Sequence, residues 1–127
     1  MRALGIDYGE KRIGLAISDE SQTLARELVI LSPKEFWEQI NQLISSQQIS
    51  KIVLGWPLNM SGEKTEKTEE VESFKLKVES KTGLPVEVID ERLSSQMAGH
   101  LPGGHQDVDS LAAQIILQNY LDKQKFK

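Results

Sequence analysis

The sequence has no cysteine and no long apolar run. Without cysteine, the chain forms neither disulfides nor thiolate metal sites. No apolar stretch approaches the roughly 20 residues that a membrane-spanning helix needs. Near the N-terminus, Asp7 interrupts the sequence before the apolar core of a secretory signal could form. We therefore expect a cytosolic protein that does not associate with membranes.

Basic residues are outnumbered by acidic ones. The chain carries 15 lysines and arginines against 19 aspartates and glutamates, a formal net charge of −4. Proteins whose affinity comes from many phosphate contacts are usually basic, so this composition argues against avid, non-specific binding of nucleic acid. The 127 residues suffice for one domain but not for two domains that flank a cleft. We expect a single domain over residues 1–127.

The pattern of apolar residues and turn residues predicts five strands, at residues 3–6, 13–18, 28–31, 49–55 and 86–89. Three helices are predicted, at residues 33–45, 65–81 and 108–120, the first opened by a capping box at Ser32 and Glu35. In the last helix we expect four residues to face inward: Val108, Leu111, Ala112 and Ile115.

The order of these elements predicts an α/β fold. The first three strands are close in sequence, which favours an antiparallel meander. Right-handed crossovers through the helices would place the fourth and fifth strands parallel to the first. We therefore expect a five-stranded mixed sheet flanked by helices.

Three acidic motifs lie far apart in the sequence. Asp7 follows the first strand, the pair Asp90 and Glu91 follows the fifth, and Asp109 opens the last helix. The carboxyl ends of parallel strands share one edge of a sheet, so these carboxylates are expected to converge. Gathered carboxylates repel one another unless they hold a divalent cation. The pattern predicts metal-dependent phosphate chemistry.

Each motif also has a purely structural interpretation. Asp7 could serve as a turn residue, and Asp109 could complement the helix dipole. Strand alternation directs one of Asp90 and Glu91 toward the site, but it does not decide which. The glycines in Gly5-Ile6-Asp7-Tyr8-Gly9 would let the backbone approach a phosphate closely.

Four segments of the chain, taken in order, resemble the YqgF/RuvX family of pre-16S ribosomal RNA nuclease or Holliday-junction-resolvase-like proteins. The segments are Gly5 to Ala16 with Ser18-Asp19, Val53 to Gly62, Asp90 to Ser95, and Val108 to Ala113 with Ile116 to Leu121. The resemblance implies a ribonuclease H-like fold and a cytoplasmic role in maturing the 5′ end of 16S rRNA during ribosome biogenesis.

The resemblance also implies a set of site residues. The metal-binding and catalytic triad corresponds to Asp7, Glu91 and Asp109, with Glu91 chosen from its pair. Two Mg²⁺ or Mn²⁺ ions, about 3.5–4 Å apart, would activate water and stabilise the leaving oxygen. A second set of residues would position the backbone phosphates of the nucleic acid: Lys11, Arg12 and Arg92.

One departure from the family pattern bears on binding. The segment before the last helix, usually longer and rich in lysine and arginine, is here Leu101-Pro102-Gly103-Gly104-His105-Gln106. This difference weakens the expectation of nucleic-acid affinity but not that of the metal site.

Three alternatives stay open at this point. The first is a Holliday junction resolvase acting on branched DNA, which favours a two-fold homodimer, whereas end trimming needs only a monomer. The second is a non-catalytic, RNA-binding assembly factor for the small-subunit precursor. The third is an ATP-binding module, which would need a second lobe.

Overall fold

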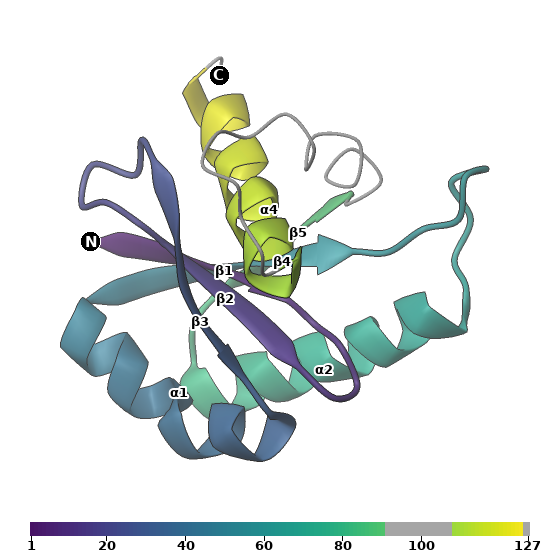
Figure 1. The fold of residues 1–127 in the computed structure, drawn as a ribbon, viewed down its shortest axis with the longest axis horizontal. Helices are drawn as coiled ribbons and strands as arrows, with labels where there is room; N and C mark the ends of the chain where they lie inside the picture. The colour runs from purple at the N-terminus through teal and green to yellow at the C-terminus, as the bar shows by residue number, and fades with distance from the viewer. Residues whose placement is uncertain (91–107, 126–127) are drawn as a thin grey trace.

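The computed structural model describes residues 1–90 and 108–125 of the chain (Figure 1). Its elements are β1 (Arg2–Asp7), β2 (Ile13–Ser18), β3 (Ala25–Leu31), α1 (Pro33–Gln47), β4 (Ile49–Trp56), α2 (Glu66–Thr82), β5 (Val86–Asp90) and α4 (Val108–Lys125). Among the described residues, no helix is both long and apolar enough to cross a membrane.

The five strands form one sheet in the order β3-β2-β1-β4-β5. β1 and β2, and β2 and β3, pair antiparallel, whereas β4 pairs parallel with both β1 and β5. This arrangement confirms the predicted meander followed by two parallel strands. It also makes β1 the central strand, so a residue at its carboxyl end has neighbouring strands on both sides.

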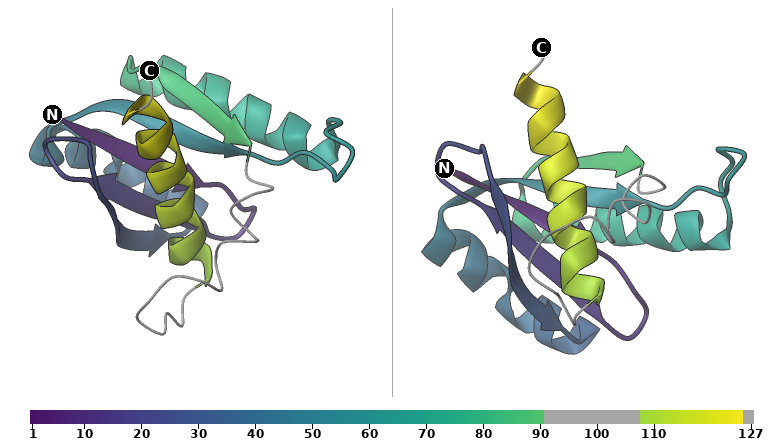
Figure 2. Two further views of the ribbon diagram at one scale, coloured as in Figure 1. Left: turned by 90° about the horizontal axis from the view of Figure 1, so that it is seen from above. Right: turned by 45° about the horizontal axis from the view of Figure 1, so that its top comes forward.

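Helices cover both faces of the sheet: α1 and α2 lie on one face and α4 lies on the other (Figures 1 and 2). Along β1, successive side chains point alternately to the two faces of the sheet. Leu4 and Ile6 join the apolar cluster under α1 and α2, whereas Ala3 joins the cluster under α4. β4 divides in the same way, since Ile52 and Val53 are fully buried in opposite clusters.

The start of α1 follows from its local sequence. The Ser32 hydroxyl accepts a hydrogen bond from the Glu35 amide at 3.2 Å, and the Glu35 carboxylate accepts one from the Ser32 amide at 2.9 Å. These bonds satisfy two amides that the helix leaves unpaired, and they hold the pKa of Glu35 below its ordinary value. The predicted capping box is confirmed.

Two elements differ from the sequence-based prediction. β3 begins at Ala25 rather than at residue 28, because its first residues continue the ladder with β2. In α4, Leu111 and Ile115 are buried as expected, but the fully buried alanine is Ala113, whereas Ala112 is only partly buried. The Val108 side chain lies outside the described side chains.

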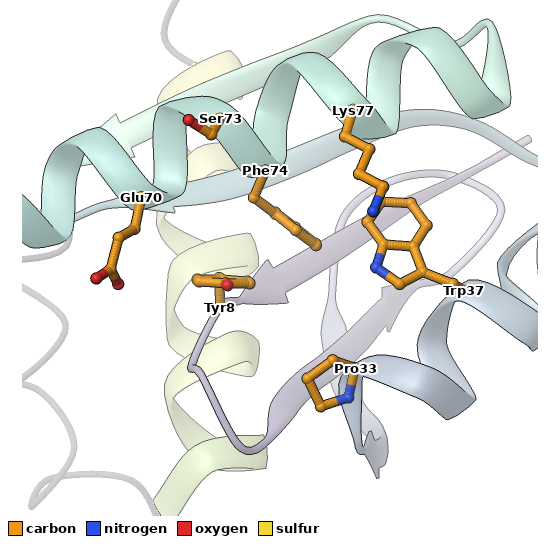
Figure 3. Close-up of a pocket in the computed structure, with 7 residues that line it drawn as sticks. All are labelled: Tyr8, Pro33, Trp37, Glu70, Ser73, Phe74 and Lys77. Atoms are coloured by element: carbon orange, nitrogen blue, oxygen red, sulfur yellow. The ribbon is translucent and has the colours of Figure 1, made fainter.

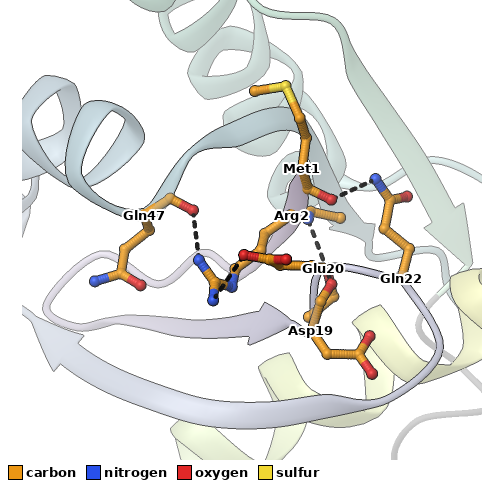
Figure 4. Close-up of polar contacts among 8 residues, drawn as sticks. Met1, Arg2, Asp19, Glu20, Gln22 and Gln47 are labelled. Atoms are coloured by element: carbon orange, nitrogen blue, oxygen red, sulfur yellow. Dashed lines mark hydrogen bonds and ion pairs between the residues drawn. The ribbon is translucent and has the colours of Figure 1, made fainter.

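The amino end of β1 is fixed by polar contacts (Figure 4). The Arg2 guanidinium donates to the Gln47 carbonyl at 3.1 Å and lies 3.8 Å from the Glu20 carboxylate. A hollow of about 560 Å³, lined by Arg2, Asp19 and Glu20 among others, opens at this end of the sheet. It lies at the opposite end of β1 from Asp7, so we assign Arg2 a structural role.

Candidate metal and nucleic-acid site

Asp7 lies at the carboxyl end of the central strand and is partly buried. It pairs with Gly14 of β2. Ala3 faces α4, so strand alternation places Asp7, four residues later, on the α4 face of the sheet. In sheets with parallel strands, ligands bind beyond the carboxyl ends of those strands, and Asp7 lies at such an end.

Helix α4 packs directly on β1, and glycine at position 5 permits the close approach. A Cβ added at Gly5 would lie 2.7 Å from the Leu117 Cβ and 3.1 Å from the Ala113 carbonyl oxygen. Contacts this short leave no room for a methyl group, so the position must be glycine for α4 to keep its place.

The direction of α4 brings its first turn toward Asp7. Near the other end of the helix, the Tyr120 hydroxyl accepts a hydrogen bond at 3.2 Å from Lys51, which is paired with Ala3 near the start of β1. Since Ala113 lies over Gly5, the chain of α4 runs opposite to β1. The first turn of α4, which contains the backbone of Asp109, therefore lies toward the carboxyl end of β1.

The end of β5 lies at the same edge of the sheet. Asp90 is the last residue of β5 and is paired with Trp56, the last residue of β4. Val86 belongs to the cluster under α1 and α2, and Ile89 belongs to the cluster under α4. Alternation along β5 therefore directs Asp90 toward the α2 face, away from the face on which Asp7 lies.

The structure describes only some of the remaining residues considered for the site. Lys11 and Arg12 are exposed in the turn between β1 and β2, close in sequence to Asp7. Glu91 and Arg92 lie outside the described residues, and so do both histidines, His100 and His105. Among the described side chains, no three His, Asp or Glu residues are grouped so that they could hold a metal ion. Two of the three predicted ligands are not among those side chains.

The structure corrects the interpretation of the glycine motif. Gly5 faces α4 and is buried, so it is not available to a phosphate. At Gly9, a Cβ would lie 2.7 Å from the Arg12 carbonyl oxygen, so this glycine is required by the tight turn itself. Both glycines are therefore explained by packing around Asp7.

The loop after β4 is built by its own hydrogen bonds. The Asn59 side-chain oxygen accepts from the amides of Ser61 and Glu63, at 3.0 and 2.9 Å. Trp56, at the start of this loop, packs against the cluster under α1 and α2. This favours a role in shielding the sheet edge over a role in stacking a base.

The fold is that of a ribonuclease H-like protein. RuvC from Thermus thermophilus, in complex with Holliday junction substrate, superimposes with a TM-score of 0.65 at 15% identity, covering 98% of this chain and 96% of that one. The Fowlpox virus resolvase in complex with Holliday junction DNA gives 0.54 at 12% identity, covering 98% and 99%. These likenesses confirm the predicted fold.

The chain belongs to the RuvX family. The family model described as "RuvX: Holliday junction resolvase" matches residues 1–123. A relative from Natranaerobius thermophilus, named "Putative pre-16S rRNA nuclease", is 36% identical, covering 98% of this chain and 96% of the relative. A relative of the same name from Caldanaerobacter subterraneus is 38% identical, covering 98% and 99%. The resemblance seen in the sequence is confirmed, and family membership supports a nuclease role.

Proposed function

We propose that this chain is a metal-dependent endonuclease that hydrolyses phosphodiester bonds in structured nucleic acid, and that its substrate is the 5′ end of pre-16S rRNA. The observation that carries the proposal is the position of Asp7, which ends the central strand on the face covered by α4, toward the first turn of that helix. The names of the full-length relatives support the choice of substrate.

The donor atoms suit a hard divalent cation. Asp7, Glu91 and Asp109 would hold it through carboxylate oxygens, which Mg²⁺ and Mn²⁺ prefer. Alternation along β5 directs Asp90 toward α2, away from the face on which Asp7 lies, which supports Glu91 rather than Asp90 as the second ligand. The cation supplies a nucleophilic water and stabilisation of charge on the phosphate when bound.

The other residues of the site would bind the backbone of the nucleic acid. Lys11 and Arg12 are exposed in the turn that follows Asp7. Arg92 follows the proposed ligand Glu91 in sequence. Cationic side chains at these positions would hold phosphates in register without reading the base sequence. Since the whole chain is acidic, these local charges would carry much of the attraction for the substrate.

A second candidate is the resolution of Holliday junctions, which the description of the family model favours. Cutting a four-way junction symmetrically needs two active sites, which a homodimer with two-fold symmetry would supply. Trimming an RNA end needs one site, which a monomer supplies. The two functions therefore differ in substrate and in the assembly that they require.

The test compares two labelled substrates, a 5′ fragment of a 16S precursor and a four-way DNA junction. Each is incubated with the wild-type protein in Mn²⁺ and in chelator. We expect metal-dependent cutting of the RNA. Cutting of the junction alone would assign the resolvase function instead. Binding of the RNA without cutting would overturn the nuclease proposal and indicate a non-catalytic assembly factor.

A further inference from the structure

A small pocket lies between α1 and α2, next to the carboxyl end of β1 (Figure 3). We call it the aromatic pocket, and it is lined by Tyr8, Pro33, Trp37, Glu70, Ser73, Phe74 and Lys77. Its volume is about 210 Å³. This is smaller than the roughly 300–1,000 Å³ of sites that enclose drug-sized ligands. The pocket therefore suits one flat ring system rather than a whole cofactor.

Aromatic rings form much of the wall. The Tyr8 and Phe74 ring centroids are 4.4 Å apart at an interplanar angle of 35°, and those of Trp37 and Phe74 are 5.6 Å apart. Phe74 is buried, whereas Tyr8 and Trp37 are only partly buried. Phe74 thus fixes two rings that keep part of their surface open to the pocket.

Charges of opposite sign lie on the two sides of the pocket. The Lys77 ammonium lies 4.6 Å from the centroid of the Trp37 ring, and the Lys81 ammonium lies 5.8 Å from it. Glu70 lies on the Tyr8 side (Figure 3). An anionic ligand would therefore place its charge near Trp37.

The position of the pocket relates it to the site described above. Tyr8 follows Asp7 directly in the chain, so the Cα atoms of these two residues lie about 3.8 Å apart. Asp7 faces α4, and Tyr8 faces α2. A strand of nucleic acid leaving Asp7 around the end of β1 would reach the aromatic pocket. A partly open aromatic surface beside ammonium groups is a combination that can bind an unpaired base and its phosphate.

We propose that the aromatic pocket binds one unpaired nucleobase of the substrate strand, packed against Tyr8 and Trp37, with the adjoining phosphate held by Lys77. The base belongs to a nucleotide near the bond that is cut. This inference rests on the proposed function for its substrate class. The surface is therefore a single-strand subsite, and it explains how a chain of net charge −4 gains affinity without a long basic segment.

The test measures binding in chelator, so it does not depend on cleavage. The chain has two tryptophans, and Trp56→Phe leaves Trp37 as the one fluorophore of that type. The probes are hexa-adenylate RNA and the same sugar-phosphate backbone without bases. We expect hexa-adenylate to quench Trp37 and the abasic strand to bind more weakly without quenching.

Three variants assign the contacts. Tyr8→Leu should weaken hexa-adenylate binding by between about fivefold and a hundredfold, the range that follows from losing one stacked base, whereas Tyr8→Phe should bind like the parent. Lys77→Gln should weaken both probes and lower the slope of log K against log salt by about one. Lys67→Gln, at an exposed position near the start of the same helix, is the matched control and should have a smaller effect.

Several outcomes would overturn the inference. One is equal binding of the two probes with Trp37 emission unchanged. Another is equal binding by folded Tyr8→Leu and Tyr8→Phe, with folding checked by circular dichroism. Quenching by free AMP as strong as by hexa-adenylate would assign the pocket to free nucleotides instead. Quenching with no cleavage of either labelled substrate would remove the nuclease proposal alone, and cleavage without quenching would remove the pocket alone.

Discussion

Asp7→Asn is expected to lower Mn²⁺-dependent cleavage at least about a hundredfold while leaving the fold intact. Loss of an outer-shell partner of a metal ligand already costs about 10–100-fold, and this change removes a proposed ligand itself. Asparagine has nearly the volume of aspartate, so the packing at the end of β1 should be kept. The measurement is single-turnover cleavage of the 16S precursor fragment, together with thermal unfolding of both proteins.

Glu10→Gln is the matched control for this prediction. It makes the same chemical change, carboxylate to amide, three residues further along in the same turn, at an exposed position. We expect its cleavage rate to stay within a few-fold of the parent rate. Similar rates for Asp7→Asn and the wild-type protein would contradict the assignment of Asp7. Equal losses in the two variants would show that general charge, rather than metal ligation, is responsible.

Gly5→Ala is expected to destabilise the protein by about 1–3 kcal/mol, the usual cost of forcing extra volume into a packed interior. The added Cβ would lie 2.7 Å from the Cβ of Leu117, which is fully buried and is part of the rigid base of its side chain. A rotamer change cannot relieve such a contact, so α4 must move away from β1. Urea unfolding of the two proteins measures the difference.

The same substitution distinguishes two roles for Gly5, namely packing against α4 and close approach of the backbone to a phosphate. If Gly5 served only to let the backbone approach a phosphate, Gly5→Ala would weaken nucleic-acid binding and leave the free energy of unfolding unchanged. The structure predicts instead that Gly5→Ala lowers the free energy of unfolding. Cleavage should fall as a consequence, because the first turn of α4 shifts relative to Asp7. Unchanged stability would contradict the packing described here.

The parts of the fold set by local patterns could be predicted from the sequence. The capping box at Ser32 predicted the start of α1, and the continuous apolar run predicted β4, because both patterns span only a few residues. The face of α4 was harder to predict, because this helix is apolar on several sides. Its contact with the sheet centres on Ala113 and Leu117, which the close approach to Gly5 selects.

The site could be predicted in part, for a similar reason. Asp7 stands out in the sequence because it follows a buried strand and precedes a glycine turn. The direction of the Asp90 side chain depends on the register of β5 against β4, in which Asp90 pairs with Trp56. No local sequence pattern contains this register. The aromatic pocket could not be predicted from the sequence, because its residues come from the turn after β1 and from α1 and α2, and they meet only when the helices pack on the sheet.

The most direct test of the central claim is the binding of Mn²⁺ itself, followed by electron paramagnetic resonance in the absence of nucleic acid. The spectrum of free Mn²⁺ is titrated with wild-type protein, with Asp7→Asn and with Glu10→Gln. The account predicts that wild type and Glu10→Gln remove free Mn²⁺ with similar affinity and that Asp7→Asn binds at least about tenfold more weakly. Equal binding by all three proteins would contradict the claim that Asp7 is a metal ligand.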